Sequence, residues 1–190
     1  MQRVRQVHRG TIAGMADKPL SYCAYVQTLD KDNVHRIYHD TQYGFPIESD
    51  DELFERLVLE INQAGLSWDT ILKKQKNFQK AYHKFSIKKV ASYKAADRAR
   101  LLADAGIIRN RLKVDAVIHN ATVILGLQKE YGSFKKWLDL HKGKTRDEWT
   151  KIFKSTFKFT GGEIVGEFLM STGYLAGAHV EGCAVGEKLK

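Results

Sequence analysis

Apolar residues recur at helical spacing along most of this chain, whereas alternation of apolar and polar residues with a period of two is scarce. The residues that begin these segments are typical of helix starts. A hydroxyl residue is followed three positions later by glutamate at Ser49, Thr145 and Thr160, which is the pattern of a capping box. Helical periodicity without strand patterns predicts an all-α fold.

One segment, residues 53–68, contains a glutamate where an apolar residue is expected. Leu53, Leu57, Ile61 and Ala64 follow helical spacing, and Glu60 lies three residues after Leu57, on or beside the same face. A buried ion pair with an arginine or lysine would explain a carboxylate there. The alternative is a pocket in which the carboxylate accepts hydrogen bonds from a planar cationic or amino-bearing ligand.

The boundaries of further helices follow from glycines and hydroxyl residues. Gly65 is expected to end the helix that carries Glu60, and Ser67 to cap the next helix. No internal repeat or long linker divides the chain, so residues 21–190 are expected to form one domain after a mobile basic arm at residues 1–20. Helical patterns cover residues 68–85, 87–93, 97–105, 111–132, 133–140, 146–155 and 163–173.

The charge of the chain limits its partners. The formal net charge is +9 in 190 residues, and basic domains attract polyanions such as nucleic acid, although a basic surface without a ligand would give the same number. No apolar run is long enough to cross a bilayer, and the N-terminus lacks the apolar region of a secretory signal. The cytoplasm is therefore the expected compartment.

Two cysteines and two histidines form a possible metal site. His179 and Cys183 stand four residues apart, and Cys23 and His39 could complete a Cys₂His₂ tetrahedron of the kind that structural zinc prefers. A single disulfide is the alternative, although an intracellular protein would keep both thiols reduced. The cysteines could also be small buried residues, with the histidines as ordinary hydrogen-bonding groups.

The segment 101–113 predicts a short turn between two helices. Gly106 allows close approach of another chain, and free amides at the start of a helix near Arg109 would form a phosphate site. Arg109, Arg111 and Lys113 add positive charge. This arrangement is typical of a helix-hairpin-helix element on a DNA backbone, and an ordinary interhelical turn has the same pattern.

Aromatic residues stand near these features. Tyr38, Tyr43 and Trp68 could stack on nucleobases, or they could belong to the core. The position of Trp68 directly after the helix of Glu60 favours a binding role, because aromatic rings beside a carboxylate suit a planar ligand.

Taken together, these stretches resemble the DNA-3-methyladenine glycosylase I family of helix-hairpin-helix glycosylases. The block E-I-N-Q-A-G-L-S-W at residues 60–68 and the Cys-His-His-x₃-Cys set are the most specific matches. The resemblance covers about residues 21–185. Other matching stretches are I-Y-H-D-T-Q-Y-G-F-P (37–46), D-A-G-I-I-R-N-R-L-K (104–113), F-K-F-T-G (157–161) and H-V-E-G-C (179–183).

The resemblance implies a fold and a function. It implies a two-lobed, all-α glycosylase with a structural zinc that joins the N- and C-terminal segments through Cys23, His39, His179 and Cys183. It makes Glu60 the catalytic pocket glutamate, with Tyr38 and Trp68 beside the base, and residues 104–113 the DNA-anchoring hairpin. Such an enzyme would be a monomer that removes 3-methyladenine from double-stranded DNA in base-excision repair, without strand cleavage.

Several residues depart from the family pattern. Tyr43 stands where tryptophan is common, Tyr25 where tryptophan is also common, and the F-L-M-S-T-G stretch with Ser171 replaces F-x-Q-A-x-G. Ala178 replaces an aspartate that could orient a zinc-bound histidine. These departures keep two alternatives open: a paralogue that excises another modified base, and a zinc-containing DNA-binding module without catalysis.

Overall fold

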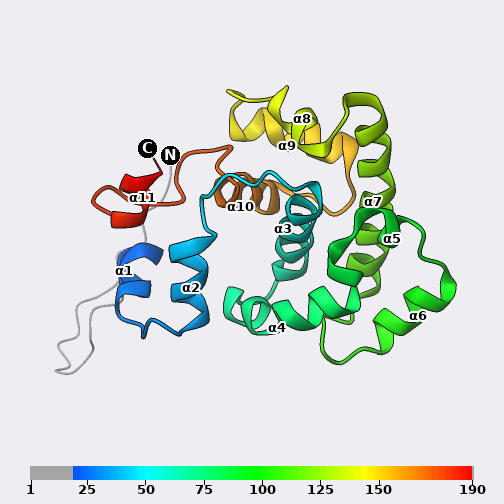
Figure 1. Ribbon diagram of the computed structural model, residues 1–190, viewed down its shortest axis with the longest axis horizontal. Helices are drawn as coiled ribbons and strands as arrows, with labels where there is room; N and C mark the ends of the chain where they lie inside the picture. Colours follow the sequence, from blue (N-terminus) through cyan, green and yellow to red (C-terminus); the bar gives the residue numbers. More distant parts are fainter. Residues whose placement is uncertain (1–18, 190) are drawn as a thin grey trace, which may run out of the picture.

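The computed structural model describes residues 19–189, and within this range all regular structure is helical (Figure 1). The predicted all-α class is therefore confirmed. The predicted basic arm lies outside these residues except for its last two. The helices are α1 (Tyr22–Gln27), α2 (Val34–Thr41), α3 (Asp50–Gln63), α4 (Trp68–Ala81), η1 (His83–Phe85), α5 (Ile87–Ala91), α6 (Ala95–Ala103), α7 (Arg111–Tyr131), α8 (Phe134–Asp139), α9 (Arg146–Thr156), α10 (Gly162–Ser171) and α11 (Ala184–Lys188).

Most predicted helix ends are where the sequence placed them. The hydroxyls of Ser49 and Ser67 each accept a hydrogen bond from the backbone amide three residues on, at the starts of α3 and α4. Thr145 and Glu148 form a complete capping box at α9. Gly65 follows the end of α3 with φ +80°, a conformation that favours glycine.

The capping box predicted at Thr160 is wrong. The Thr160 hydroxyl is buried and donates to the backbone carbonyl of Phe153, 3.1 Å away. Gly161 is the N-cap of α10 without a side-chain hydrogen bond. A tertiary contact to α9 has thus taken the hydroxyl that the local pattern assigned to the cap.

The helix predicted over residues 68–85 ends early. Helix α4 stops at Ala81, and His83, Lys84 and Phe85 follow with φ of +52°, +53° and +56°. Such left-handed backbone costs roughly 1–2 kcal/mol per residue without glycine. Burial offsets this cost, because Phe85 is fully buried and stacks on Tyr82 with ring centroids 5.7 Å apart.

Helix α3 occupies the centre of the molecule (Figure 1). It packs against α4, α7, α8 and α10, and Leu57, Val58 and Ile61 along it are fully buried. Helices α1, α2 and α11 lie together at one side of the ribbon in Figure 1, so the two ends of residues 19–189 are close in space. Among the described helices, none is both long and apolar enough to span a membrane.

Candidate active site

The four residues predicted for a ligand pocket line one cavity. Tyr38 and Tyr43 come from α2 and the turn after it, Glu60 from α3 and Trp68 from the first turn of α4. The cavity has a volume of about 510 Å³. Its remaining lining residues are Tyr22, Gln63, Glu163 and Glu167.

The Glu60 carboxylate is buried without a partner among the described residues. Glu60 is 4% exposed, and within residues 19–189 it makes no hydrogen bond or ion pair. Burial raises the pKa of Glu60 from 4.5 to about 8; the Arg56 charge opposes this rise and the Glu167 charge adds to it. The ion-pair explanation for this glutamate is therefore not what the fold adopts.

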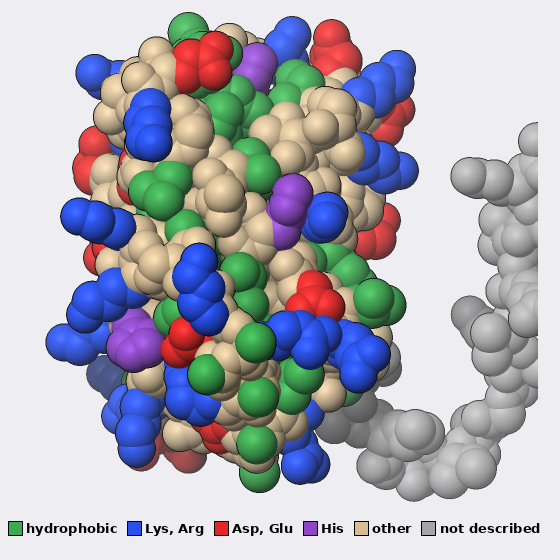
Figure 2. Space-filling view, turned by 90° about the vertical axis from the view of Figure 1, so that its right-hand side faces the viewer, with side chains coloured by type: hydrophobic (Ala, Val, Ile, Leu, Met, Phe, Trp, Pro, Cys, Tyr) green, Lys and Arg blue, Asp and Glu red, His purple; other side chains and the backbone are tan. Residues whose placement is uncertain are grey.

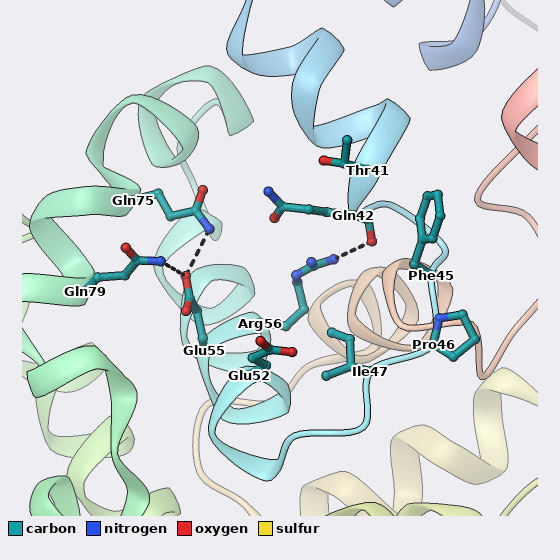
Figure 3. A pocket seen from close by; sticks show the side chains of 10 residues that line it. All are labelled: Thr41, Gln42, Phe45, Pro46, Ile47, Glu52, Glu55, Arg56, Gln75 and Gln79. Atoms are coloured by element: carbon teal, nitrogen blue, oxygen red, sulfur yellow. Dashed lines mark hydrogen bonds between the residues drawn. The ribbon is translucent and has the colours of Figure 1, made fainter.

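Arg56 is the buried cation closest in sequence to Glu60, but its hydrogen bonds go elsewhere. Its Nη1 donates to the Tyr38 hydroxyl at 3.1 Å and to the Ser171 carbonyl at 3.2 Å. Figure 3 shows the guanidinium directed at the backbone oxygen of Gln42, in a cleft where two glutamine amides converge on Glu55. Arg56 therefore orients Tyr38 and leaves the Glu60 carboxylate free.

Aromatic rings form the walls around Glu60. The rings of Tyr38 and Trp68 meet edge to face with centroids 5.2 Å apart, and those of Tyr38 and Tyr43 are 5.6 Å apart. Burial raises the pKa values of Tyr38 and Tyr43, so both phenols stay neutral near pH 7. The cavity thus places the unpaired Glu60 carboxylate among neutral aromatic surfaces, an arrangement suited to a planar ligand that donates hydrogen bonds.

The predicted metal ligands come together between the chain ends. The ligand atoms of Cys23, His39, His179 and Cys183 all lie within 4.8 Å of one another. Cys183 Sγ is 3.6 Å from His39 Nε2 and 3.5 Å from His179 Nδ1. Tetrahedral zinc with bonds of about 2.0–2.3 Å separates its ligand atoms by about 3.5 Å, so the group has the dimensions of a metal site.

Hydrogen bonds orient both histidines toward the centre of this cluster. His39 Nδ1 donates to Asp40 Oδ1 at 2.7 Å, and His179 Nε2 donates to the Tyr43 carbonyl at 2.8 Å. Each bond fixes the tautomer that presents a lone pair to the cysteines. The Tyr43 carbonyl therefore orients His179 although Ala178 stands where the family often has aspartate.

Gly106 lies in the turn between α6 and α7, as predicted, and its surroundings explain the glycine. Its carbonyl accepts hydrogen bonds from Lys74 Nζ at 3.2 Å and Asn77 Nδ2 at 3.3 Å on α4. A Cβ at position 106 would lie 2.9 Å from Asp104 Oδ1 and 3.3 Å from Asn77 Cβ. Close packing against Asp104 and Asn77, rather than a positive φ, thus favours glycine here.

The cations near this turn divide into exposed and buried groups. Arg109 and Arg111 are exposed, and α7 begins at Arg111 after its N-cap Asn110, as the predicted helix at residues 111–132 and the expected start near Arg109 require. Lys113 is 4% exposed, and its ammonium donates to the carbonyls of Asn62 at 2.8 Å and Ala64 at 2.6 Å. The side chain predicted to add accessible charge instead ties α7 to the end of the Glu60 helix.

The wider surface around these helices is basic. Figure 2 views the side that lies at the right of Figure 1, where α6 and α7 run, and Lys and Arg side chains are spread over most of it while Asp and Glu are sparser. Basic surfaces of this kind favour a polyanionic partner.

The sequence model of the methyladenine glycosylase family matches residues 28–153, which is more than half of the chain. The chain belongs to this family. Among methyladenine glycosylases, it is 34% identical over 174 residues to DNA-3-methyladenine glycosylase 1 of Escherichia coli K12, with 82% of this chain and 92% of that protein covered. DNA-3-methyladenine glycosylase of Haemophilus influenzae is 31% identical over 174 residues, with 82% and 94% covered.

Solved structures of methyladenine glycosylases have the same fold. A 3-methyladenine DNA glycosylase I from Staphylococcus aureus superimposes with a TM-score of 0.77 at 33% identity, covering 88% of this chain and 97% of that one. A 3-methyladenine DNA glycosylase I variant in complex with 3-methyladenine also gives 0.77, at 32% identity, with 86% and 96% covered.

Sequence reasoning missed several residues of the cavity. Its lining residues Tyr22, Gln63, Glu163 and Glu167 were not predicted. Arg56, which lies outside the lining and donates to Tyr38, was not predicted either. The argument that identified Glu60 could have found Glu167, which lies three residues after Ile164 and three before Met170. A carboxylate among apolar positions at helical spacing is the shared signal.

Proposed function

We propose that this chain is a monofunctional DNA glycosylase that hydrolyses the N-glycosidic bond of 3-methyladenine in alkylated DNA. The observation that carries the proposal is the Glu60 carboxylate, buried and unpaired in a cavity with aromatic walls. The named relatives, which are DNA-3-methyladenine glycosylases, supply the reaction. A DNA-binding module without catalysis would have no need for an unpaired carboxylate that destabilises its fold.

The charge of the lesion explains the carboxylate. A base must leave the DNA stack before an enzyme can act on it. Methylation at N3 gives adenine a positive charge in the nucleotide, so the base already is a good leaving group and departs as a neutral purine. Glu60 accepts hydrogen bonds from the edge of the base, and its charge favours the cationic lesion over normal adenine. Tyr38, Tyr43 and Trp68 pack around the ring.

The same proposal assigns a structural zinc to Cys23, His39, His179 and Cys183. Two thiolates and two imidazoles are the ligands that structural zinc prefers, and the four atoms have suitable spacing. Bonds from zinc to these four side chains would cross-link the N- and C-terminal segments. The zinc would take no part in cleavage of the glycosidic bond. It would also support the pocket, because Tyr38 precedes a ligand in the chain and the Tyr43 carbonyl orients another.

DNA would be held by the α6–α7 hairpin between two helical lobes. Arg109 and Arg111 would contact phosphates of double-stranded DNA near the free amides of α7, on a turn that Gly106 allows to pack closely against α4. Lys113 would hold the hairpin against the Glu60 helix. Such an enzyme would act as a monomer in the cytoplasm.

Base release from methylated duplex DNA tests the proposal. The products are separated by chromatography, so that 3-methyladenine and 7-methylguanine are counted independently for wild type and Glu60→Gln. We expect release of 3-methyladenine by wild type and a large loss in the variant. Release of another base alone would favour the paralogue, and release of no base by a chain that binds DNA would contradict glycosylase activity.

A further inference from the structure

A second carboxylate faces the cavity that contains Glu60. Glu167 lies on α10, which packs against α3, and its side chain is half-buried in the cavity lining. Among the described residues it has no hydrogen bond or ion pair. Two unpaired carboxylates from different helices therefore share one aromatic-walled cavity.

The charged groups around Glu167 do not neutralise it. Arg146 on α9 lies against α10, where a Cβ at Gly166 would be 2.5 Å from its Nε. Its guanidinium donates to the Gly162 carbonyl at 3.1 Å and pairs with Glu163 at 2.9 Å. In the cavity lining, Glu60 and Tyr43 both feel the Glu167 charge, and the Arg56 charge acts on both in the opposite direction.

Like charges in one cavity make each other harder to ionise. Burial raises the pKa of Glu167, with the Arg146 charge opposing and the Glu163 charge adding to the rise, and the Glu167 charge in turn raises the pKa of Glu60. A cationic ligand removes this repulsion, whereas a neutral ligand of the same shape leaves it in place. The cavity therefore distinguishes ligands by charge as well as by shape.

We propose, on the basis of the function proposed above, that Glu167 is a second specificity-determining carboxylate, which with Glu60 makes the base pocket selective for a positively charged purine. Two observations support this inference: Glu60 and Glu167 line the same cavity, and Arg146 forms its ion pair with Glu163 rather than with Glu167.

The reaction predicts where Glu167 acts. The bond between C1′ and N9 breaks, its electron pair goes to N9, and the base becomes neutral while positive charge develops on the sugar. Water then forms the new C–O bond at C1′ and loses its proton to solvent. A carboxylate that faces the base interacts most strongly with the bound substrate and less as the charge leaves the ring. Glu167 therefore contributes to lesion affinity and to release of the neutral product, rather than to the rate of bond cleavage.

Binding of small bases tests this inference without catalysis. Binding of 3,9-dimethyladeninium, a permanent cation, and of neutral 3-methyladenine is followed by the fluorescence change that each causes, for wild type, Glu167→Gln and Glu167→Asp. We expect Glu167→Gln to bind the cation roughly tenfold more weakly than wild type. Glu167 is half-buried, so this loss should lie between that for removing one partner of an exposed charge pair and that for a fully buried pair. Affinity for the neutral base should change less than about twofold, and Glu167→Asp should retain most of the preference.

A matched control and a pH profile separate this role from a structural one. Glu130→Gln removes the same charge from an exposed site on α7 and should leave the cation-to-neutral affinity ratio unchanged. In Glu167→Gln, the pH below which cation affinity falls should move lower, because Glu60 ionises more easily without a like charge beside it. Single-turnover base release at saturating enzyme should remain within about threefold of wild type.

The outcomes distinguish the two proposals. An unchanged cation-to-neutral ratio in Glu167→Gln, or an equal loss for both bases, would overturn the role of Glu167 even if the enzyme excises 3-methyladenine. If wild type binds the cation preferentially but releases no base from methylated DNA, the proposed function is overturned. The role of Glu167 is then decided by whether Glu167→Gln lowers the cation-to-neutral affinity ratio. Failure of wild type to bind either base would overturn both.

Discussion

Replacing Glu60 by glutamine should stabilise the folded protein while removing its activity. Glutamine has nearly the shape of a protonated glutamate, so it keeps the neutral form that the buried site favours and removes the option of charge. The magnitude follows from the pKa of Glu60, which is about 8 in the folded protein against an ordinary value of 4.5. Each unit of difference corresponds to about 1.4 kcal/mol between the protonation states.

The sign of the effect depends on which state binds the proton. Below about pH 4.5 Glu60 is protonated in both states and has no effect. Between 4.5 and 8 the unfolded chain releases the proton and the folded chain keeps it, so stability falls as the pH rises. The loss for wild type is about 3 kcal/mol at pH 7 and about 5 kcal/mol above the folded pKa, and Glu60→Gln avoids it.

Urea unfolding of wild type and Glu60→Gln at about pH 5, 7 and 9 measures this difference. At pH 7, a gain of about 3 kcal/mol corresponds to an increase of roughly 6–12 °C in Tm for a chain of this size. The exposed Glu130→Gln is the control and should change stability by less than about 0.5 kcal/mol at every pH. The reasoning would fail if Glu60→Gln were less stable than wild type at pH 7, or if the difference in unfolding free energy did not change with pH. Either result would mean that the Glu60 carboxylate has a favourable partner in the folded protein.

Three further outcomes are expected, one each at the metal cluster, the α6–α7 hairpin and the pocket. Purified protein should contain about one zinc per chain by mass spectrometry, and a chelator or Cys183→Ser should lower its Tm. Arg111→Ala should reduce the slope of log K for DNA against log salt by about one, whereas Lys113→Met should leave that slope unchanged and lower the unfolding free energy by about 1–3 kcal/mol, because two carbonyls lose their donor. Calorimetry in buffers of different ionisation enthalpy should show release of nearly one proton when a cationic base binds at pH 7, because Glu60 then ionises.

The sequence predicted most helices and both ligand groups because these depend on local or strongly typed signals. Ser49, Ser67 and Gly65 act within their own turns, so tertiary structure leaves their roles unchanged. Glu60 stood out because one charge interrupts an apolar face. Cysteine and histidine have few common roles, and the family resemblance placed Cys23 beside Cys183 across nearly the whole chain.

The features that sequence reasoning missed depend on contacts between distant segments. Thr160 bonds to α9 instead of capping α10, and burial of Phe85 imposes a left-handed turn on residues with no local preference for it. Lys113 looks like its exposed neighbour Arg111 in sequence, yet it faces the carbonyls at the end of α3. Glu167 enters the pocket only because α10 packs across α3.

The orientation of Arg56 decides whether the pocket can select a charge. The Arg56 guanidinium, one helical turn from Glu60, could have paired with its carboxylate. The pocket would then carry no net charge at this point and would not prefer a cationic ligand. The carbonyls of Ser171 and Gln42 and the Tyr38 hydroxyl hold Nη1 instead. The positive charge of Arg56 still limits the rise in the pKa of Glu60. The carboxyl is therefore protonated in the free protein near pH 7, but its pKa is close enough to 7 that binding of a cationic base ionises it. A neutral adenine supplies no such charge and cannot stabilise the ionised form of Glu60. The buried carboxyl that destabilises the folded protein therefore makes the pocket bind the cationic lesion more tightly than adenine.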